Sequence, residues 1–325
     1  MVELFCKTAI GRLVRLLWMK ACEHYGIEVR FHTIERNTME QIFKTLDIGN
    51  LRPFARGGTG ECYRLDEETI LKLYYEGFPE SRVLREKAGA RAALVAGVPT
   101  AISFDMVKVG NREGVVYERV RGGTLSELVA KDPSQAGELG GIFAGIARSL
   151  HDAPVSDTGL PRPTEPIRTE LSKISYAPEE TVANIAAFMD DLDLESHYVH
   201  GDFHPNNVIM TDDGPMLIDM GSFSVGSPMF DLATAYFSLF ESPEATAGGR
   251  STFNGLTRGE AQAFWKGFEA MYFGGAMDEA QAARLKRVTL LKKLRFESLY
   301  GSRFAPEYCA SIRREVLMIF GNGRG

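Results

Sequence analysis

The sequence predicts an α+β protein in which a small sheet-rich lobe precedes a larger helix-rich lobe. Short apolar runs separated by glycine and charged turns fill residues 51–120, and this pattern is typical of strands and hairpins. After residue 121, apolar residues recur mostly at helical intervals. The 325 residues, 44% of them hydrophobic, are enough for two units with buried cores.

Composition limits the classes of partner and of compartment. The formal net charge of −6 gives no electrostatic reason to expect nucleic acid as a partner. No apolar run reaches the roughly 18 to 20 residues that span a bilayer, so we expect no stable membrane insertion. Four widely spaced cysteines without a CxxC pair indicate reduced thiols and a cytoplasmic protein. The oligomeric state stays open.

The predicted elements of the small lobe follow from its turns. Residues 1–48 predict a helical extension whose role stays open, and residues 49–120 predict a small sheet with one helix. Short strands around glycine and acidic turns are predicted in this sheet from the segments LRPFARGGTGECYRL (51–65) and ETILKLYY (68–75). The segment 79–97, which opens on proline and closes on glycine, predicts the helix.

Residues 121–325 predict the helical lobe. It opens on Thr124 and Glu127, which have the spacing of a capping box. The strands NVIMT and PMLID, joined by DDG, are the clear exception to the helical pattern. Helices are predicted at 134–153, 178–194, 229–240, 257–275, 279–300 and 306–319.

The stretch YVHGDFHPNNVIMTDDGPMLIDMGS, residues 198–222, concentrates polar groups around this hairpin. Asn207 and Asp219 stand at the outer ends of two paired strands, which lie about 4.8 Å apart. Their amide and carboxylate oxygens are hard ligands suited to Mg²⁺. Asp202 lies five residues before Asn207, where it can receive a proton from a hydroxyl near the metal.

Upstream residues supply the other parts of a phosphoryl-transfer site. Gly57, Gly58 and Gly60 lie between two strands, where glycine lets backbone N–H groups approach a phosphate. Lys72 follows in the next strand and can reach phosphate oxygens. Glu86 on the following helix is placed to pair with this lysine, with Glu80 as the alternative.

These motifs, in this order, resemble the aminoglycoside phosphotransferase and choline kinase-like family. The similarity covers residues 51–240 and rests on HGDxxxxN followed by IDxG. It implies a bilobal protein-kinase-like fold with a small antiparallel-sheet N-lobe and a mostly helical C-lobe. It also implies an enzyme that moves the γ-phosphate of ATP, with GTP possible, to a hydroxyl of a small molecule with the help of Mg²⁺.

The resemblance also implies a role for each site residue. Asp202 would be the catalytic base, and Asn207 and Asp219 would hold the metal. Lys72, paired with Glu86, would bind phosphate. The backbone from Glu118 to Val120 would contact the purine, and Asp231 would brace the catalytic loop. Two departures are Tyr63, which replaces the last loop glycine of protein kinases, and Met220, which replaces their phenylalanine; the second favours a small-molecule substrate.

Three alternatives remain at this stage. His200, Asp202 and His204 could bind zinc in a hydrolase, although His200 is better interpreted as a brace of the loop. A nucleotide-binding regulatory protein without turnover is a second function. The third alternative is a pocket for an anionic substrate formed by the basic run RLKRVTLLKKLRF, residues 284–296. A solvated helix face is the favoured interpretation of this run.

Overall fold

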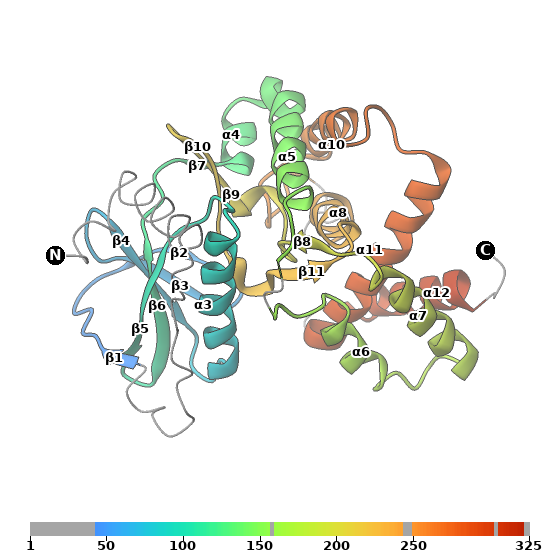
Figure 1. The fold of residues 1–325 in the computed structure, drawn as a ribbon, viewed down its shortest axis with the longest axis horizontal. Coiled ribbons are helices and arrows are strands. Elements are labelled where there is room, and N and C mark those ends of the chain that lie inside the picture. Colours follow the sequence, from blue (N-terminus) through green and yellow to red (C-terminus); the bar gives the residue numbers. More distant parts are fainter. Residues whose placement is uncertain (1–42, 157–158, 243–248, 302–304, 322–325) are drawn as a thin grey trace, which may run out of the picture. The chain divides into compact units, whose positions relative to one another are not determined.

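The computed structural model describes residues 43–156, 159–242, 249–301 and 305–321. These residues form two compact units, one built from the chain up to Val83 together with Ile102–Arg119, and the other from Leu84–Ala101 together with the chain from Val120 onward. The first unit carries a sheet and the second carries most of the helices (Figure 1). The predicted α+β class is therefore confirmed.

The first unit is a six-stranded sheet with the strand order β1-β5-β6-β4-β3-β2. All neighbouring strands are antiparallel except β1 and β5, which are parallel. The sheet is therefore mixed, whereas the sequence predicted antiparallel strands alone. The strands are β1 (Phe43–Thr45), β2 (Pro53–Arg56), β3 (Gly60–Arg64), β4 (Thr69–Tyr74), β5 (Ser103–Val109) and β6 (Arg112–Glu118).

Strand β1 corrects the end of the expected helical extension. Residues 1–42 of that extension lie outside the described residues, but Phe43–Thr45 is a strand. It pairs with β5, and the N–H of Leu46 continues the pairing by donating to the carbonyl of Lys108 at 2.9 Å. A three-residue strand that pairs with a segment some sixty residues away leaves no periodic signal in its own sequence.

Strand β4 explains how this sheet presents its lysine. Leu71 and Leu73 are fully buried in a cluster with Tyr63 and Val107. Because successive side chains of a strand point to opposite faces, Lys72 lies on the other face of the sheet. The alternation therefore separates the apolar core of this unit from the face that carries the proposed phosphate-binding residue.

The second unit is mainly helical. Its glycines allow two of its helices to pack very closely: a β-carbon added at Gly140 would lie 1.9 Å from the carbonyl oxygen of Phe264, and one at Gly267 would lie 1.9 Å from that of Gly137. The helices α5 and α10 that carry these residues lie side by side (Figure 1). The helices are α3 (Glu80–Val95, which begins in the first unit), α4 (Leu125–Lys131), α5 (Ala136–His151), α6 (Glu165–Leu171), α7 (Glu179–Leu192), α8 (Met229–Tyr236), α10 (Arg258–Tyr272), α11 (Glu279–Tyr300) and α12 (Pro306–Phe320).

The strands of this unit organise the polar stretch. β9 (Val208–Thr211) and β10 (Gly214–Leu217) form the predicted hairpin, and β7 (Gly123–Thr124) joins its edge. A second pair, β8 (His197–Val199) with β11 (Ser224–Gly226), was not predicted. Each of these strands has three residues, which is too short for an alternating pattern to be readable.

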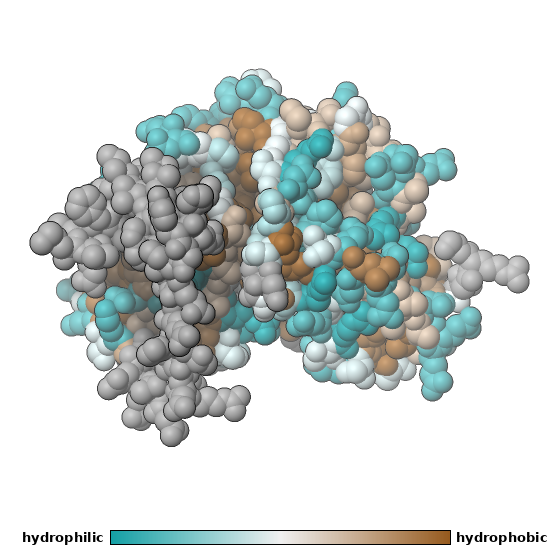
Figure 2. All heavy atoms as spheres, viewed as in Figure 1, coloured by the Kyte–Doolittle hydropathy of each residue, from teal (hydrophilic) through white to brown (hydrophobic). Residues whose placement is uncertain are grey.

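An unpredicted helix, α6, lies between α5 and α7. Its Pro166 lies in the first turn, where the missing N–H costs nothing. On the face shown in Figure 2, hydrophilic residues are mixed with hydrophobic ones. Within the described part of the chain, no helix is both long and apolar enough to cross a membrane.

Candidate active site

The loop from His200 to Asn207, which is the predicted catalytic loop, is anchored by a buried aspartate. Asp231, on α8, is fully buried and accepts hydrogen bonds from the backbone N–H groups of His200 at 2.9 Å and Gly201 at 2.7 Å. Nε2 of His151 lies 3.1 Å from the same carboxylate, and Nδ1 of that ring lies 2.8 Å from the Tyr272 hydroxyl. The expectation that Asp231 braces the loop is confirmed.

His200 uses both ring nitrogens within the loop. Its Nδ1 accepts the backbone N–H of Asp202 at 3.2 Å, so its Nε2 carries the proton and donates to the carbonyl of Ile218 at 3.0 Å. The ring therefore ties the loop to the chain just before Asp219. Neither nitrogen is left for zinc, and the described residues contain no group of three His, Cys, Asp or Glu side chains arranged to hold a metal ion.

Asp202 combines an accessible carboxylate with cationic surroundings. Its side chain is 45% exposed, whereas the imidazole of His204, 3.5 Å away, is 8% exposed. Burial acts to raise the pKa of Asp202, but the charge and hydrogen bond of His204, together with Lys292, outweigh it and lower this pKa. Asp202 is therefore ionised at neutral pH, and its carboxylate is accessible from outside the loop.

The predicted neighbourhood of Asn207 and Asp219 follows from the hairpin. Val208 pairs with Leu217, and the N–H of Ile218 donates to the carbonyl of Asn207 at 3.0 Å. Asn207 and Asp219 therefore stand at the same end of β9 and β10. The amide nitrogen of Asn207 donates to the carbonyl of Asp202 at 2.9 Å, which leaves the amide oxygen for another ligand.

Asp219 has an unusual backbone. With φ of 62°, it is the one described non-glycine residue with positive φ. Left-handed conformations cost free energy for residues with a β-carbon, and they concentrate at functional sites. Asn207 carries an amide oxygen and Asp219 a carboxylate. Both are types of oxygen ligand that Mg²⁺ accepts, so this donor set fits the metal.

The structure also locates the predicted phosphate-binding residues of the first unit. Gly57 and Gly58 form the exposed tip of the β2–β3 hairpin, which the N–H of Gly57 closes by donating to the carbonyl of Gly60 at 2.9 Å. A β-carbon at Gly60 would lie 2.4 Å from the carbonyl oxygen of Leu73, so only glycine fits there. Lys72 pairs with Cys62 in the middle of β4.

Glu86 belongs to the part of α3 that lies in the second unit. It is 6% exposed, and a β-carbon added at Gly221 would meet its Cγ at 3.3 Å. Helix α3 is held closely there, because a β-carbon at Gly89 would lie 2.1 Å from the carbonyl oxygen of Met220. Glu80 lies in the first turn of the helix. Burial favours Glu86 as the functional carboxylate, since buried charges are retained with a partner.

The predicted purine-binding segment is partly occupied by internal hydrogen bonds. The N–H of Glu118 donates to the carbonyl of Ile102 at 2.8 Å, and that of Arg119 donates to the carbonyl of Glu68 at 2.7 Å. The Glu118 carboxylate accepts the N–H of Ile102 at 3.3 Å. Val120 is therefore the best candidate in this segment for a backbone donor to a purine.

Sequence reasoning missed a lysine beside the catalytic loop. Lys292, on α11, donates to the carbonyl of Gly201 at 3.1 Å and to the hydroxyl of Thr234. Burial lowers the pKa of Lys292 to about 8, against the opposing attraction of Asp202. The basic run 284–296 contains this residue, but its composition alone does not indicate which lysine turns inward.

Solved structures share this architecture. A choline/ethanolamine kinase family protein from Mesorhizobium loti aligns with a TM-score of 0.54 at 15% identity, over 85% of this chain and 90% of its own. An aminoglycoside-3′-phosphotransferase of type VIII aligns with a TM-score of 0.52 at 19% identity, over 75% and 93%. An amicoumacin kinase in complex with AMP-PNP and Ca²⁺ aligns with a TM-score of 0.54 at 14% identity, over 92% and 96%. The chain therefore has the protein-kinase-like fold.

The family follows from the sequence itself. The profile described as the phosphotransferase enzyme family matches residues 50–264, which is more than half of the chain. The chain belongs to this family, as the motifs predicted. No curated protein sequence matches it.

Proposed function

We propose that this chain is an ATP-dependent phosphotransferase that transfers the γ-phosphate to a hydroxyl group of a small molecule. The observation that carries the proposal is the loop from His200 to Asn207. Buried Asp231 and the His200 ring hold it rigidly, and it presents one ionised, half-exposed carboxylate, that of Asp202. Family membership supports the reaction class, and the nucleotide complexes of relatives with this fold support ATP.

In the proposed reaction, Asp202 accepts a hydrogen bond from the acceptor hydroxyl and aims its oxygen at the γ-phosphorus. The oxygen forms a bond to phosphorus, the bond to the bridging oxygen of ADP breaks, and the hydroxyl proton passes to Asp202. Because the pKa of this carboxylate is lowered, its main contribution is orientation, and proton transfer follows bond formation. Lys72 would bind phosphate oxygens, as would the N–H groups of the glycine hairpin.

Mg²⁺ would be held by Asn207 and Asp219, where it would neutralise the charge that develops on the phosphates. The fixed amide of Asn207 and the left-handed backbone of Asp219 support this assignment. The purine would bond to the backbone at Val120. The regulatory alternative is less well supported, because Lys72, Asp202, Asn207 and Asp219 are all present.

The test is ADP formation from Mg²⁺–ATP with a panel of hydroxylated metabolites, for wild type and Asp202→Asn. The variant should lose about 10²- to 10⁴-fold in turnover and should bind Mg²⁺–AMP-PNP within about threefold of wild type. Asp212→Asn, in the exposed turn between β9 and β10, is the matched control and should keep full activity. An Asp202→Asn enzyme with wild-type turnover would refute the assignment of the base.

A further inference from the structure

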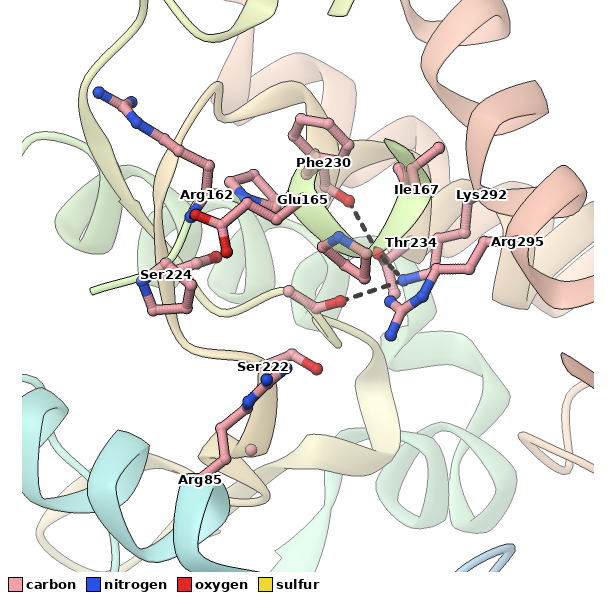
Figure 3. Close-up of a pocket in the computed structure, with 15 residues that line it drawn as sticks. Arg85, Arg162, Glu165, Ile167, Ser222, Ser224, Phe230, Thr234, Lys292 and Arg295 are labelled. Atoms are coloured by element: carbon pink, nitrogen blue, oxygen red, sulfur yellow. Dashed lines mark hydrogen bonds between the residues drawn. The ribbon is translucent and has the colours of Figure 1, made fainter. Parts of the chain in front are cut away.

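A cavity of about 70 Å³ lies beside the catalytic loop, within the second unit (Figure 3). Its lining includes Gly201, which directly precedes Asp202, and Ser222, which follows the IDMG segment. This volume accommodates several water molecules or one small polar group. A ligand group that occupied the cavity would therefore lie next to the proposed base.

The lining is strongly basic. Arg85, Arg162, Lys292 and Arg295 line the cavity, whereas Glu165 is its one acidic side chain. Four positive charges against one negative charge leave an excess of three positive charges. The Glu165 carboxylate is already used locally, because it accepts the backbone N–H of Arg162 at 3.1 Å.

Two of the cations are committed to the framework. Arg162 donates to the carbonyls of Glu195 at 2.7 Å and of Val225 at 3.3 Å. Lys292 donates to Gly201 and Thr234, and the dashed lines of Figure 3 mark these bonds. Both residues contribute positive charge at fixed positions, and the Lys292 bond couples the cavity directly to the catalytic loop.

Two other cations are turned toward the cavity. Figure 3 shows the guanidinium groups of Arg85 and Arg295 directed to the space around Ser222 from two different helices. Within the described part of the chain, Arg85 has no hydrogen-bond or ion-pair partner. The charge of Arg295 also helps to lower the pKa of Glu170, which belongs to helix α6. Guanidinium groups bind carboxylate and phosphate in a bidentate manner.

We infer that the acceptor is an anionic hydroxylated small molecule, with a carboxylate or phosphate group held by Arg85, Lys292 and Arg295 and a hydroxyl presented to Asp202. This inference rests on the proposed phosphotransferase function. The products are ADP and the phosphate ester of the acid, with the hydroxyl proton on Asp202. A polycationic acceptor is disfavoured, because its amines would meet three like charges.

The activity test compares acceptors that differ only in charge. Glycerate is paired with glycerol and gluconate with glucose, gentamicin is the cationic comparison, and ADP formation is measured with Mg²⁺–ATP. The anionic member of each pair should have at least a tenfold higher kcat/KM. For the anionic acceptors, Arg295→Gln and Arg85→Gln should each raise KM about tenfold with a smaller change in kcat. Arg314→Gln, an exposed arginine on α12, should change neither. Faster turnover of gentamicin or of the neutral members would overturn the inference.

A binding test separates this inference from the proposed function. Inorganic sulfate is titrated calorimetrically into the protein saturated with Mg²⁺–AMP-PNP. Sulfate should bind to wild type and to Arg314→Gln with equal affinity. Its affinity for Arg295→Gln should be at least fivefold lower. Equal sulfate affinity in all three proteins would overturn the anion site. Failure of wild type to bind Mg²⁺–AMP-PNP or to form ADP would instead refute the phosphotransferase proposal, and sulfate titration of the nucleotide-free protein would still decide the anion site.

Discussion

At the scale of single residues, Asp231 holds the loop that carries Asp202. Its two carboxylate oxygens accept hydrogen bonds from consecutive backbone N–H groups, those of His200 and Gly201, and the ring of His151 lies against the same group. A fully buried carboxylate is retained because each of these donors would otherwise be unsatisfied. The exposed Asp202 thus depends on a buried aspartate for its position.

Asp231→Asn is expected to lower the free energy of unfolding by about 2–4 kcal/mol. Asparagine keeps the shape but replaces one acceptor oxygen with an NH₂ group, which faces a backbone N–H and cannot bond to it. Urea denaturation measures the change, and the exposed Asp212→Asn should stay within about 0.5 kcal/mol of wild type. A loss below about 1 kcal/mol for Asp231→Asn would contradict the bracing role.

Lys292 should make stability depend on pH above neutrality. Burial, opposed by the nearby Asp202 and Asp231 and reinforced by Arg295, lowers its pKa from 10.5 to about 8. Between these two values the unfolded chain binds the proton and the folded chain does not, so the free energy of unfolding rises with pH across this window. Below pH 8 both states are charged, and the cost of burying the charge is present in full.

We therefore expect wild type to gain about 1–3 kcal/mol of stability relative to Lys292→Met between pH 7.5 and pH 10. The comparison with the variant cancels the titration of tyrosines and of other lysines. Urea denaturation of both proteins at several pH values measures the difference. A difference that stays constant over this range would show that Lys292 is not buried as a charged group.

At the scale of elements, the closest packing in the helical unit depends on glycine. Gly140 on α5 lies so near α10 that an added β-carbon would stand 1.9 Å from the carbonyl oxygen of Phe264. Gly145, on the same helix, has no atom of a neighbouring element within 4 Å of such a carbon. Alanine substitutions at these two positions therefore distinguish the effect of close helix packing from the effect of helix propensity.

Gly140→Ala should destabilise the protein by roughly 1–3 kcal/mol, because the backbones of α5 and α10 would have to move apart. Gly145→Ala should instead stabilise it by about 0.5–1 kcal/mol, since alanine loses less backbone entropy in a helix. Thermal or urea unfolding of both variants measures the contrast. If both substitutions stabilised the protein, the close contact would be refuted.

The sequence predicted those elements that carry their own pattern. Helix α11 was expected at 279–300 and forms over Glu279–Tyr300, and the β9–β10 hairpin lies where its apolar runs and its turn indicated. Strands β1, β8 and β11 were missed, because each has three residues and is stabilised by pairing with a distant segment. A local pattern does not encode such a partner.

The candidate site divides in the same way. Asp202, Asn207 and Asp219 could be named because they lie within eighteen residues of one another in a specific motif. The cavity could not be predicted, since Arg85 and Lys292 come from helices about two hundred residues apart. The basic run 284–296 was interpreted as a solvated face, whereas Lys292 and Arg295 of this run line the cavity.

At the scale of the whole molecule, the residues proposed to bind the nucleotide and its metal are divided between two compact units. The glycine hairpin and Lys72 belong to the first unit, whereas Asn207 and Asp219 belong to the second. A ligand that binds the folded chain and not the unfolded chain stabilises it by mass action, by about 2.7 kcal/mol at one hundred times its Kd. The unfolding temperature therefore reports nucleotide binding without knowledge of the acceptor.

With Mg²⁺, AMP-PNP should raise the Tm of wild type by several degrees at saturating concentration, and EDTA should remove most of this shift. Asp219→Ala should lose most of the shift even with Mg²⁺ present, because the proposed metal site would lack its carboxylate ligand. The substitution also forces alanine into a left-handed backbone, so Asp219→Asn, which tolerates that conformation, controls for strain. If Asp219→Asn and Asp219→Ala both kept the full Mg²⁺-dependent shift, the carboxylate would not be a metal ligand and the proposed division of roles between the two units would fail.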